Sequence, residues 1–257
     1  SYPCFPGALK LNNPMKTVLI LGASSEVALA LANQLAAKSC ELILAARNSD
    51  RLAAVKSDLA IRFGINVTLA EFDALRPDTH KNFYESLEPK PDTAICVFGY
   101  LGDHTKAMVD WQESATIVMS NYVGAVSILN VIANDFENRK EGMIVGISSV
   151  AGERGRQSNY VYGSAKAGFT AYLSGLRNRL FKSGVRVITV KPGFMKTRML
   201  AGMKTSAFLT AQPERAAALI IRAMQRKKDV VYVLPVWKWI MLIIRNIPEF
   251  TFKKLKL

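Results

Sequence analysis

Seven short apolar runs recur along the chain, and most are separated by stretches with helical character. The first run, TVLIL, is unbroken, as expected of a strand buried on both faces. Strands that alternate with helices predict a parallel sheet covered by helices on both sides. The expected strands are 17–21, 42–45, 66–70, 93–97, 143–147, 185–190 and 230–234.

Right-handed crossovers would wind such a chain into an α/β, Rossmann-type, doubly wound domain with a seven-stranded parallel sheet. A chain of 257 residues, half of them hydrophobic, suits one domain with a sizeable core. We expect this domain to span 15–235, with a long helix near 114–136. Residues 1–14 are interpreted as an N-terminal arm or a remnant outside the domain, and 236–257 as an amphipathic tail.

The net charge of +14 is unevenly distributed, because residues 177–257 hold 18 Lys and Arg against 3 Asp and Glu. This excess predicts an anionic partner such as phosphate groups, a membrane surface or nucleic acid. The alternative is a basic surface that only maintains solubility. No RNA-binding motif or aromatic-basic platform accompanies the charge, so we do not expect a nucleic-acid partner.

The cysteines and histidines bear on the compartment and on metals. Cys4, Cys40 and Cys96 lack the spacing of a disulfide framework or metal site, and 1–14 lack a signal-peptide pattern. These features predict a cytoplasmic protein. With only His80 and His104 present, we expect no His-built metal site.

Ligands of open α/β sheets bind beyond the carboxyl ends of the strands. Small or polar residues follow most of the predicted strands at that edge. In chain order they are Gly22, Ser24, Ser25, Asp73, Gly99, Ser149, Pro192 and Gly193.

Tyr162 and Lys166 are four residues apart on a predicted helix, so their side chains share one face. A free tyrosine has a pKa of about 10, too high for ready proton exchange at neutral pH. A nearby ammonium stabilises the phenolate and is expected to lower the pKa of Tyr162. The pair therefore predicts general acid–base catalysis by Tyr162, tuned by Lys166.

These residues resemble the motifs of the short-chain dehydrogenase/reductase family. The family signature is Tyr-x-x-x-Lys with a serine thirteen residues earlier, which matches Tyr162, Lys166 and Ser149. The family's helix asparagine matches Asn121 in NYVG, and its Pro-Gly-x-x-x-Thr segment matches 192–197. The resemblance covers roughly 15–234, and four elements in the right order make it specific.

The resemblance implies a hydride transfer between a nicotinamide cofactor and a carbonyl compound, with Tyr162 as proton donor or acceptor. Ser149 would hold the carbonyl oxygen, and Lys166 would also bind the nicotinamide ribose. Asn121 would position a water that relays protons towards Lys166. The family also implies a homodimer or homotetramer, built partly on the helices around Asn121 and Tyr162.

The residue after the second strand indicates which cofactor is used. NAD-binding proteins place an acid there for the ribose 2′-hydroxyl, whereas an arginine accommodates the 2′-phosphate of NADP. Arg47 is present and no acid is, so we expect NADP(H); the alternative is a solvated loop charge. Asp73 resembles the adenine-contacting aspartate of the family.

Two segments depart from the family pattern. In the loop LGASSEVA, Glu26 and Ala28 replace the second and third glycines, and a carboxylate would repel the cofactor's phosphates unless it turns away. An acid in the first helical turn is also favourable by itself. In CVFG, Gly99 is kept while Phe98 replaces a small residue. We expect a cofactor site that is retained but reshaped.

The tail contains an apolar run at 236–244, Pro248 and a basic end. The run is too short to span a hydrocarbon core of ~30 Å. It could lie in a membrane interface with Trp237, Trp239 and Phe252 inserted, or pack on the sheet or across a dimer interface.

The altered loops and the tail resemble the branch of the family that reduces a 2-keto sugar carried on a polyprenyl phosphate. The resulting hypothesis is an NADPH-dependent reductase of a lipid-linked carbonyl substrate, cytoplasmic or peripheral at the inner face of the membrane. One alternative is a soluble reductase of small ketones that uses the tail for oligomerisation. Another is a non-catalytic NADP-binding protein, against which the intact catalytic set argues.

Overall fold

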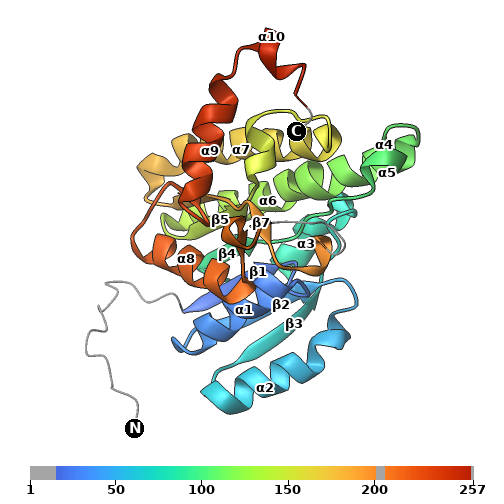
Figure 1. Ribbon diagram of the computed structural model, residues 1–257. Helices are drawn as coiled ribbons and strands as arrows, with labels where there is room; N and C mark the ends of the chain where they lie inside the picture. The colour runs from blue at the N-terminus through green and yellow to red at the C-terminus, as the bar shows by residue number, and fades with distance from the viewer. Residues whose placement is uncertain (1–15, 201–205, 256–257) are drawn as a thin grey trace.

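A twisted central sheet with helices on both faces forms the centre of the protein (Figure 1). The structure is a computed structural model and describes residues 16–200 and 206–255. Seven strands, all paired in parallel, follow the order β3-β2-β1-β4-β5-β6-β9. The predicted doubly wound, seven-stranded Rossmann fold is therefore confirmed.

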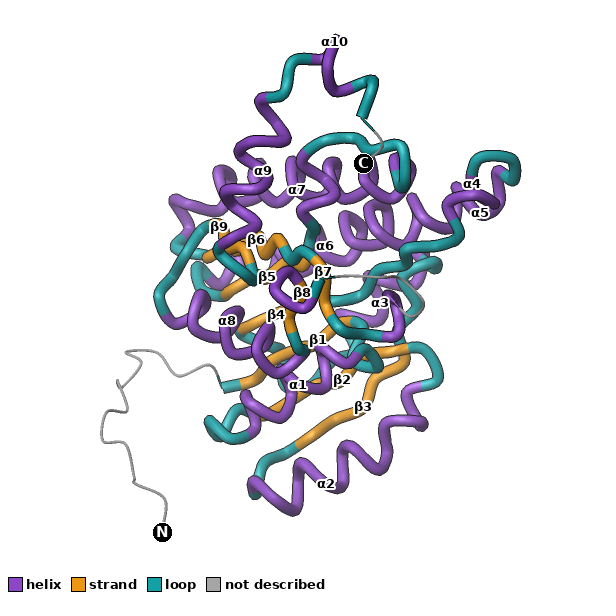
Figure 2. Tube along the Cα trace, viewed as in Figure 1, coloured by secondary structure: helices purple, strands orange, loops and turns teal. Residues whose placement is uncertain are grey.

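Each of the seven strands overlaps an apolar run in the sequence. They are β1 (Thr17–Leu21), β2 (Glu41–Ala46), β3 (Val67–Glu71), β4 (Thr93–Cys96), β5 (Met143–Ile147), β6 (Arg186–Lys191) and β9 (Val230–Tyr232). A second, two-stranded sheet pairs β7 (Phe194–Met195) with β8 (Thr210–Ala211), shown among the orange strands of Figure 2. Strands of two residues carry no periodicity, which is why the sequence did not predict them.

The strand order reverses next to β1. This strand pairs with β2 on one side and β4 on the other, so the chain moves outwards to β3 and then returns to β4. Doubly wound sheets bind ligands in the crevice beyond the carboxyl ends of their strands at such a switch point.

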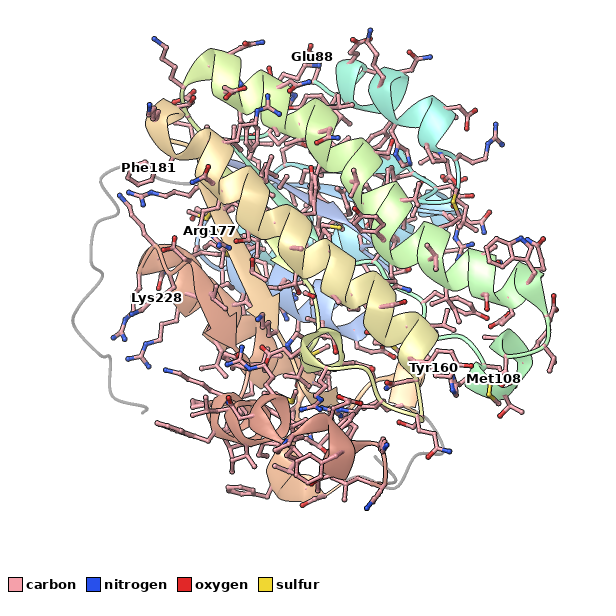
Figure 3. The ribbon with its side chains drawn as sticks, turned by 90° about the horizontal axis from the view of Figure 1, so that it is seen from above. Glu88, Met108, Tyr160, Arg177, Phe181 and Lys228 are labelled. Atoms are coloured by element: carbon pink, nitrogen blue, oxygen red, sulfur yellow. The ribbon has the colours of Figure 1, made fainter. Side chains whose placement is uncertain are left out.

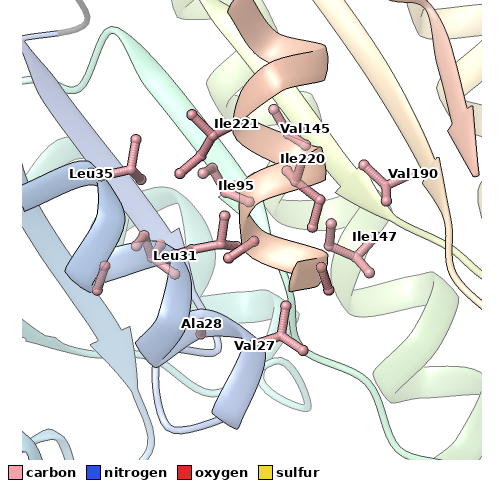
Figure 4. Packing of buried hydrophobic residues seen from close by; sticks show 14 of the residues in the cluster. Val27, Ala28, Leu31, Leu35, Ile95, Val145, Ile147, Val190, Ile220 and Ile221 are labelled. Atoms are coloured by element: carbon pink, nitrogen blue, oxygen red, sulfur yellow. The ribbon is translucent and has the colours of Figure 1, made fainter. Parts of the chain in front are cut away.

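Helices cover the first face of the sheet at α1 (Glu26–Ala36), α2 (Ala53–Phe63) and α8 (Pro213–Gln225). Figure 4 shows Leu31 of α1 and Ile220 of α8 packed against Ile95 and Val145 of the sheet. The strands are apolar on both faces because each face supports a helical layer.

The opposite face carries α3 (His80–Glu85), α6 (Gly124–Arg139) and α7 (Tyr160–Leu180). In Figure 3, α6 and α7 lie side by side across the sheet, and the labels Tyr160 and Phe181 mark the two ends of α7. Buried Phe136 of α6 and Leu173 of α7 belong to the second core cluster, together with Leu19 of β1.

A continuous helical stretch runs over Trp111–Arg139, through α5 (Trp111–Val118), a π-helical turn (Met119–Val123) and α6. By length and mean hydropathy (1.6) alone it could cross a membrane. In the fold, however, α6 buries Ile128, Ile132 and Phe136 against the sheet, as a core helix does.

The chain after the last strand forms α9 (Val236–Asn246) and α10 (Glu249–Phe252), with α4 (His104–Ala107) at another edge of the molecule. One face of α9 is buried, with Trp237 4% and Met241 0% exposed. The other face is open, with Trp239 61% and Ile243 68% exposed. α9 is therefore a packed part of the domain that also presents an apolar surface.

Candidate active site

Ser149 and Tyr162 come from adjacent elements. Ser149 follows β5 and precedes a short 3₁₀ turn (Val150–Glu153). Its Oγ accepts a hydrogen bond of 3.1 Å from the N–H of Ala151 in that turn. Tyr162 is in the first turn of α7. The Ser149 hydroxyl hydrogen-bonds the Tyr162 phenol and favours its ionised form.

Lys166 lies one turn after Tyr162 and is buried, with 3% of the residue exposed. Its Nζ donates a hydrogen bond of 3.1 Å to the carbonyl of Ile147 and lies 5.9 Å from the centroid of the Tyr162 ring. Burial lowers the pKa of Lys166 to about 8, because desolvation disfavours the ammonium. An ammonium has three N–H donors, so this lysine can bind further acceptors in the cavity.

The expected lowering of the Tyr162 pKa is wrong. Burial raises the pKa of Tyr162 to about 12, and the Ser149 hydroxyl offsets only part of that rise. Lys166 does not counteract it because its ammonium is directed at the Ile147 carbonyl. The phenol is therefore a proton donor in this state.

Asn121 lies in the π-helical turn between α5 and α6. Its Nδ2 donates to the carbonyls of Ile117 (2.8 Å) and Tyr100 (2.6 Å), and its Oδ1 accepts from the N–H of Tyr100 (3.2 Å). The side chain thus ties the loop after β4 to the widened turn, a helical irregularity frequent at functional sites.

Gly99 allows these groups to approach one another. A methyl group built on Gly99 would lie 2.8 Å from Asn121 Oδ1 and 3.2 Å from Lys166 Nζ. Asn121 and Lys166 therefore face the same glycine, and a side chain at this position would separate them.

The catalytic residues predicted from the sequence meet at one cavity of about 120 Å³. Ser149, Tyr162 and Lys166 line it directly, and Asn121 adjoins it through Gly99. Of the predicted cofactor residues, the cavity is also lined by Gly99, Pro192, Gly193 and Thr197. The remaining predicted residues lie beyond this cavity, after β1, β2 and β3: Gly22, Ser24, Ser25, Arg47 and Asp73.

The glycine-rich loop keeps one glycine that its geometry requires. Gly22 has a φ of +89°, and a methyl group there would lie 2.6 Å from the backbone nitrogen of Phe98. Ser25 caps α1 by accepting a 3.2 Å hydrogen bond from the N–H of Ala28, whereas Ser24 is exposed. The loop therefore presents the amino end of α1 to the crevice, as an anion-binding loop does.

The Glu26 carboxylate is held by an arginine from another part of the chain. Arg198, just after Thr197, donates to Glu26 Oε1 through Nε (2.9 Å) and its backbone N–H (3.2 Å). Its guanidinium also donates to the carbonyl of Ser24 at 3.3 Å. Burial raises the pKa of Glu26, but the backbone hydrogen bonds and Arg198 outweigh that effect and leave the pKa lowered.

Arg47 and Asp73 follow β2 and β3. Arg47 is exposed, and within the described residues no hydrogen bond or ion pair holds its guanidinium. Asp73 Oδ1 accepts a 3.0 Å hydrogen bond from the N–H of Leu75. Glu71, which the sequence did not single out, binds the backbone N–H groups of Asn48 and Ser49, both at 2.9 Å, and so shapes the loop that carries Arg47.

The structure corrects the expectation for two aromatic residues of the tail. Trp237 does not face outwards: it lines the catalytic cavity and donates from Nε1 to the carbonyl of Leu209 at 3.1 Å. Phe252 lies under the guanidinium of Arg154, 3.8 Å from its Cζ to the ring centroid. Both are occupied by contacts within the protein, so only Trp239 of the three is available to a lipid surface.

Comparison with known families agrees with this geometry. A family model described as short chain dehydrogenase matches residues 16–207. The chain belongs to this family. Two relatives described as oxidoreductases match this chain over nearly its whole length. An uncharacterized oxidoreductase of Mycobacterium tuberculosis is 39% identical over 241 residues, covering 93% of this chain and 96% of the relative.

The second relative is an uncharacterized oxidoreductase in the mprA 5′ region of Streptomyces coelicolor. It is 32% identical over 251 residues, which cover 95% of this chain and 97% of the relative. Among solved structures, a short-chain dehydrogenase from Sphingobium yanoikuyae in complex with NADPH superposes with a TM-score of 0.79. That match covers 91% of this chain and 97% of the other, at 22% identity, and supports the fold.

Within the described residues, no cluster of three or more His, Cys, Asp or Glu could hold a metal ion.

Proposed function

We propose that this short-chain dehydrogenase is an NADPH-dependent carbonyl reductase in which Tyr162 is the general acid. The observation that carries the proposal is the convergence of Ser149, Tyr162 and Lys166 on one cavity at the carboxyl edge of the sheet. Asn121 and Gly99 complete the arrangement from the neighbouring loop.

The residues at the crevice fit a dinucleotide. Gly22 and Gly99 keep the backbone open where side chains would collide, and the amino end of α1 attracts phosphate. The unpaired Arg47 suits a 2′-phosphate, and the Sphingobium relative was solved with NADPH. When bound, NADPH supplies the hydride.

The side chains of the cavity would handle the carbonyl oxygen. Ser149 Oγ–H would donate a hydrogen bond to that oxygen and stabilise the negative charge that develops on it. Tyr162 would donate its phenolic proton to the same oxygen, and the buried Lys166 ammonium would stabilise the phenolate that remains. The pKa of about 12 keeps Tyr162 protonated at neutral pH, which favours reduction over alcohol oxidation.

The test is the reductase activity of Tyr162→Phe, which keeps the ring and removes the proton. We expect the rate of NADPH oxidation with a reducible ketone to fall by about 10²–10⁴-fold, while the melting temperature changes little. An active Tyr162→Phe enzyme would refute the assigned role of Tyr162.

For the substrate, we propose a keto sugar carried on a polyprenyl phosphate. The support is the apolar wall of the cavity, formed by Phe194, Met195 and Trp237, and the exposed apolar face of the adjoining α9. A reductase of small soluble ketones is the alternative. Activity on lipid-linked keto sugars compared with short ketones of equal concentration would decide between them.

A peripheral contact with the inner face of the membrane follows from the same surface. Trp239 and Ile243 project from α9 near Lys238 and Arg245, a combination that suits a headgroup boundary. Because Trp237 and Met241 are core residues, removing the tail would damage the fold. The informative variant is Trp239→Ser/Ile243→Ser, which should lose binding to anionic liposomes without losing stability.

We also propose a homodimer or homotetramer, formed through the face of α5 and α7 that carries the exposed Trp111. Sedimentation of the wild type and Trp111→Ser would test it. A monomeric wild type would exclude this assembly.

A further inference from the structure

Arg156 is a cation in the wall of the catalytic cavity that the proposed proton transfer does not use. It lies in the loop between the 3₁₀ turn after Ser149 and helix α7, and it lines the same cavity as Ser149 and Tyr162. Asn159, which immediately precedes α7, lines the cavity beside it.

The guanidinium of Arg156 has few partners. Its Nη2 donates to the thioether of Met241 at 3.0 Å, and a thioether is a weak acceptor. Its buried Nε has no hydrogen-bond partner among the described residues. No carboxylate of the described chain lies within ion-pair distance of it. Burial lowers the pKa of Arg156, which shows that the charge is poorly solvated, although a guanidinium keeps its proton in proteins.

Glu153, the acid nearest in sequence, is already committed to other cations. Its Oε1 accepts hydrogen bonds from Lys191 Nζ (2.8 Å) and from the Tyr232 hydroxyl (2.5 Å). Arg245 Nε lies 3.7 Å from its Oε2. One carboxylate is therefore shared by Lys191 and Arg245, and it acts on Arg156 only through space, without an ion pair or hydrogen bond to it.

The rest of the cavity adds no negative charge. Among the described residues, its lining contains Arg156 and Lys166 and no Asp or Glu. The side-chain Oδ1 of Asn159 is buried and has no partner in the described part of the chain. A half-buried cation without an ion-pair partner is costly in a protein, and an anionic ligand oxygen would compensate it. The Asn159 oxygen is an acceptor and would instead take a hydrogen bond from a donor such as a substrate hydroxyl.

We propose that Arg156 binds an anionic oxygen group, a carboxylate or a phosphate, on the carbonyl substrate. This inference rests on the proposed reductase function and narrows its substrate class. The cavity lining also includes the apolar side chains of Phe194, Met199, Leu200 and Trp237, so the substrate combines an anionic group, a reducible carbonyl and an apolar portion. The planar guanidinium fork suits both carboxylate and phosphate oxygens.

The experiment compares ketones that differ only in charge. The probes are 5-oxohexanoate with its methyl ester, and dihydroxyacetone phosphate with dihydroxyacetone; the two pairs separate a carboxylate site from a phosphate site. NADPH oxidation is measured for the wild type, Arg156→Met, Arg156→Lys and Asn159→Ala. Arg186→Met is the control, because Arg186 is exposed at the amino end of β6, the edge opposite the cavity.

We expect the wild type to favour the anionic member of at least one pair by about tenfold or more in kcat/KM. Arg156→Met should abolish that preference, mainly by raising KM for the anionic ketone. Arg156→Lys should retain part of the preference, whereas Asn159→Ala, which removes an unpaired acceptor, and Arg186→Met should keep the wild-type preference. Equal use of both members by the wild type, or a preference that survives Arg156→Met, would overturn the inference.

A binding arm keeps this inference separate from the reductase assignment. The same probes are added to Tyr162→Phe and to Tyr162→Phe/Arg156→Met, and the melting temperature is recorded. If the anionic probes raise the melting temperature of Tyr162→Phe but not that of Tyr162→Phe/Arg156→Met, the anion site is supported even if no probe is reduced. Absence of any rise and of any kinetic preference would exclude the site, and Tyr162→Phe/Arg156→Lys replaces the Arg156→Met double variant in this arm if the latter fails to fold.

Discussion

Trp237 occupies the space that a side chain on Gly193 would need: a methyl group built on Gly193 would lie 2.0 Å from both Cε2 and Nε1 of the indole. The Pro-Gly segment after β6 and helix α9 are thus fitted to each other at the catalytic cavity. Gly193 belongs to the family motif, and in this protein it leaves room for Trp237, which is not part of that motif.

Gly193→Ala should displace Trp237 and loosen α9. Overpacking of this kind costs about 1–3 kcal/mol of unfolding free energy, which urea denaturation would measure. Indole fluorescence should shift towards that of an exposed tryptophan. Gly175→Ala is the matched control, because a methyl group on Gly175 meets no atom within 4 Å. If the collision is the cause, Gly193→Ala should cost little further stability when it is made in a Trp237→Ala background.

Arg154 fixes the end of α9, and its replacement should release that helix. Its Nη1 donates to the carbonyls of Ile244 (2.8 Å) and Arg245 (3.1 Å), and its side chain is only 14% exposed. Arg154→Met should lower the unfolding free energy by about 1.5–3 kcal/mol, the usual contribution of a hydrogen bond to a charged group. Amide exchange over 236–252 should accelerate, and unchanged protection there would contradict the clamp.

Lys166 gives the stability a pH dependence with a defined sign. Burial lowers its pKa from 10.5 to about 8, so the unfolded chain binds the proton more tightly than the folded one. The free energy of unfolding contributed by this group should therefore rise as the pH increases from about 8 to about 10.5, by at most ~3 kcal/mol. The measurement is the difference between wild type and Lys166→Met in urea at several pH values. A difference that falls over this range would show that the ammonium is not desolvated.

The contact between Glu26 and Arg198 should matter for the cofactor. Arg198→Ala would leave a free carboxylate at the amino end of α1, and we expect KM for NADPH to rise roughly two- to fivefold. Glu26→Gly/Arg198→Ala removes the carboxylate as well and should recover the wild-type value. If the double variant stays impaired, Arg198 contributes by itself rather than by neutralising Glu26.

Arg47→Ala should reduce the preference for NADPH over NADH by about tenfold, because a charge-assisted contact with the 2′-phosphate would be lost. The constants for NADH should not change. Arg51→Ala, an exposed arginine one turn further on, serves as the control. Equal losses for both cofactors would indicate a structural role for Arg47.

The sequence predicted the sheet well because a strand buried on both faces is apolar throughout, as TVLIL in β1 is. It also predicted that Ser149, Tyr162 and Lys166 meet, because each follows a strand end or begins the next helix. The raised pKa of Tyr162 could not be predicted, since burial and the direction of the Lys166 ammonium depend on tertiary packing.

Residues that act across long sequence separations escaped sequence reasoning for the same reason. Arg198 reaches Glu26 from 172 positions away, and Arg154 reaches Ile244 from 90 positions away. The sequence did single out Trp237 as a tryptophan in an apolar run. The run alone, however, does not indicate which face of the helix packs against the domain. Arg156 and Asn159 carried no signal in the sequence, because their unpaired polar atoms can be recognised only in the folded cavity.

The position of α9 allows the wall of the pocket to evolve separately from the strands of the sheet. The helix follows the last strand of the sheet, so its residues can change without altering any strand pairing or crossover. A descendant that exchanged only the segment after β9 would receive a new pocket wall around an unchanged proton donor. Selection for new substrates can therefore act on this segment without altering the catalytic residues, as long as Trp237 and Met241 keep their core contacts.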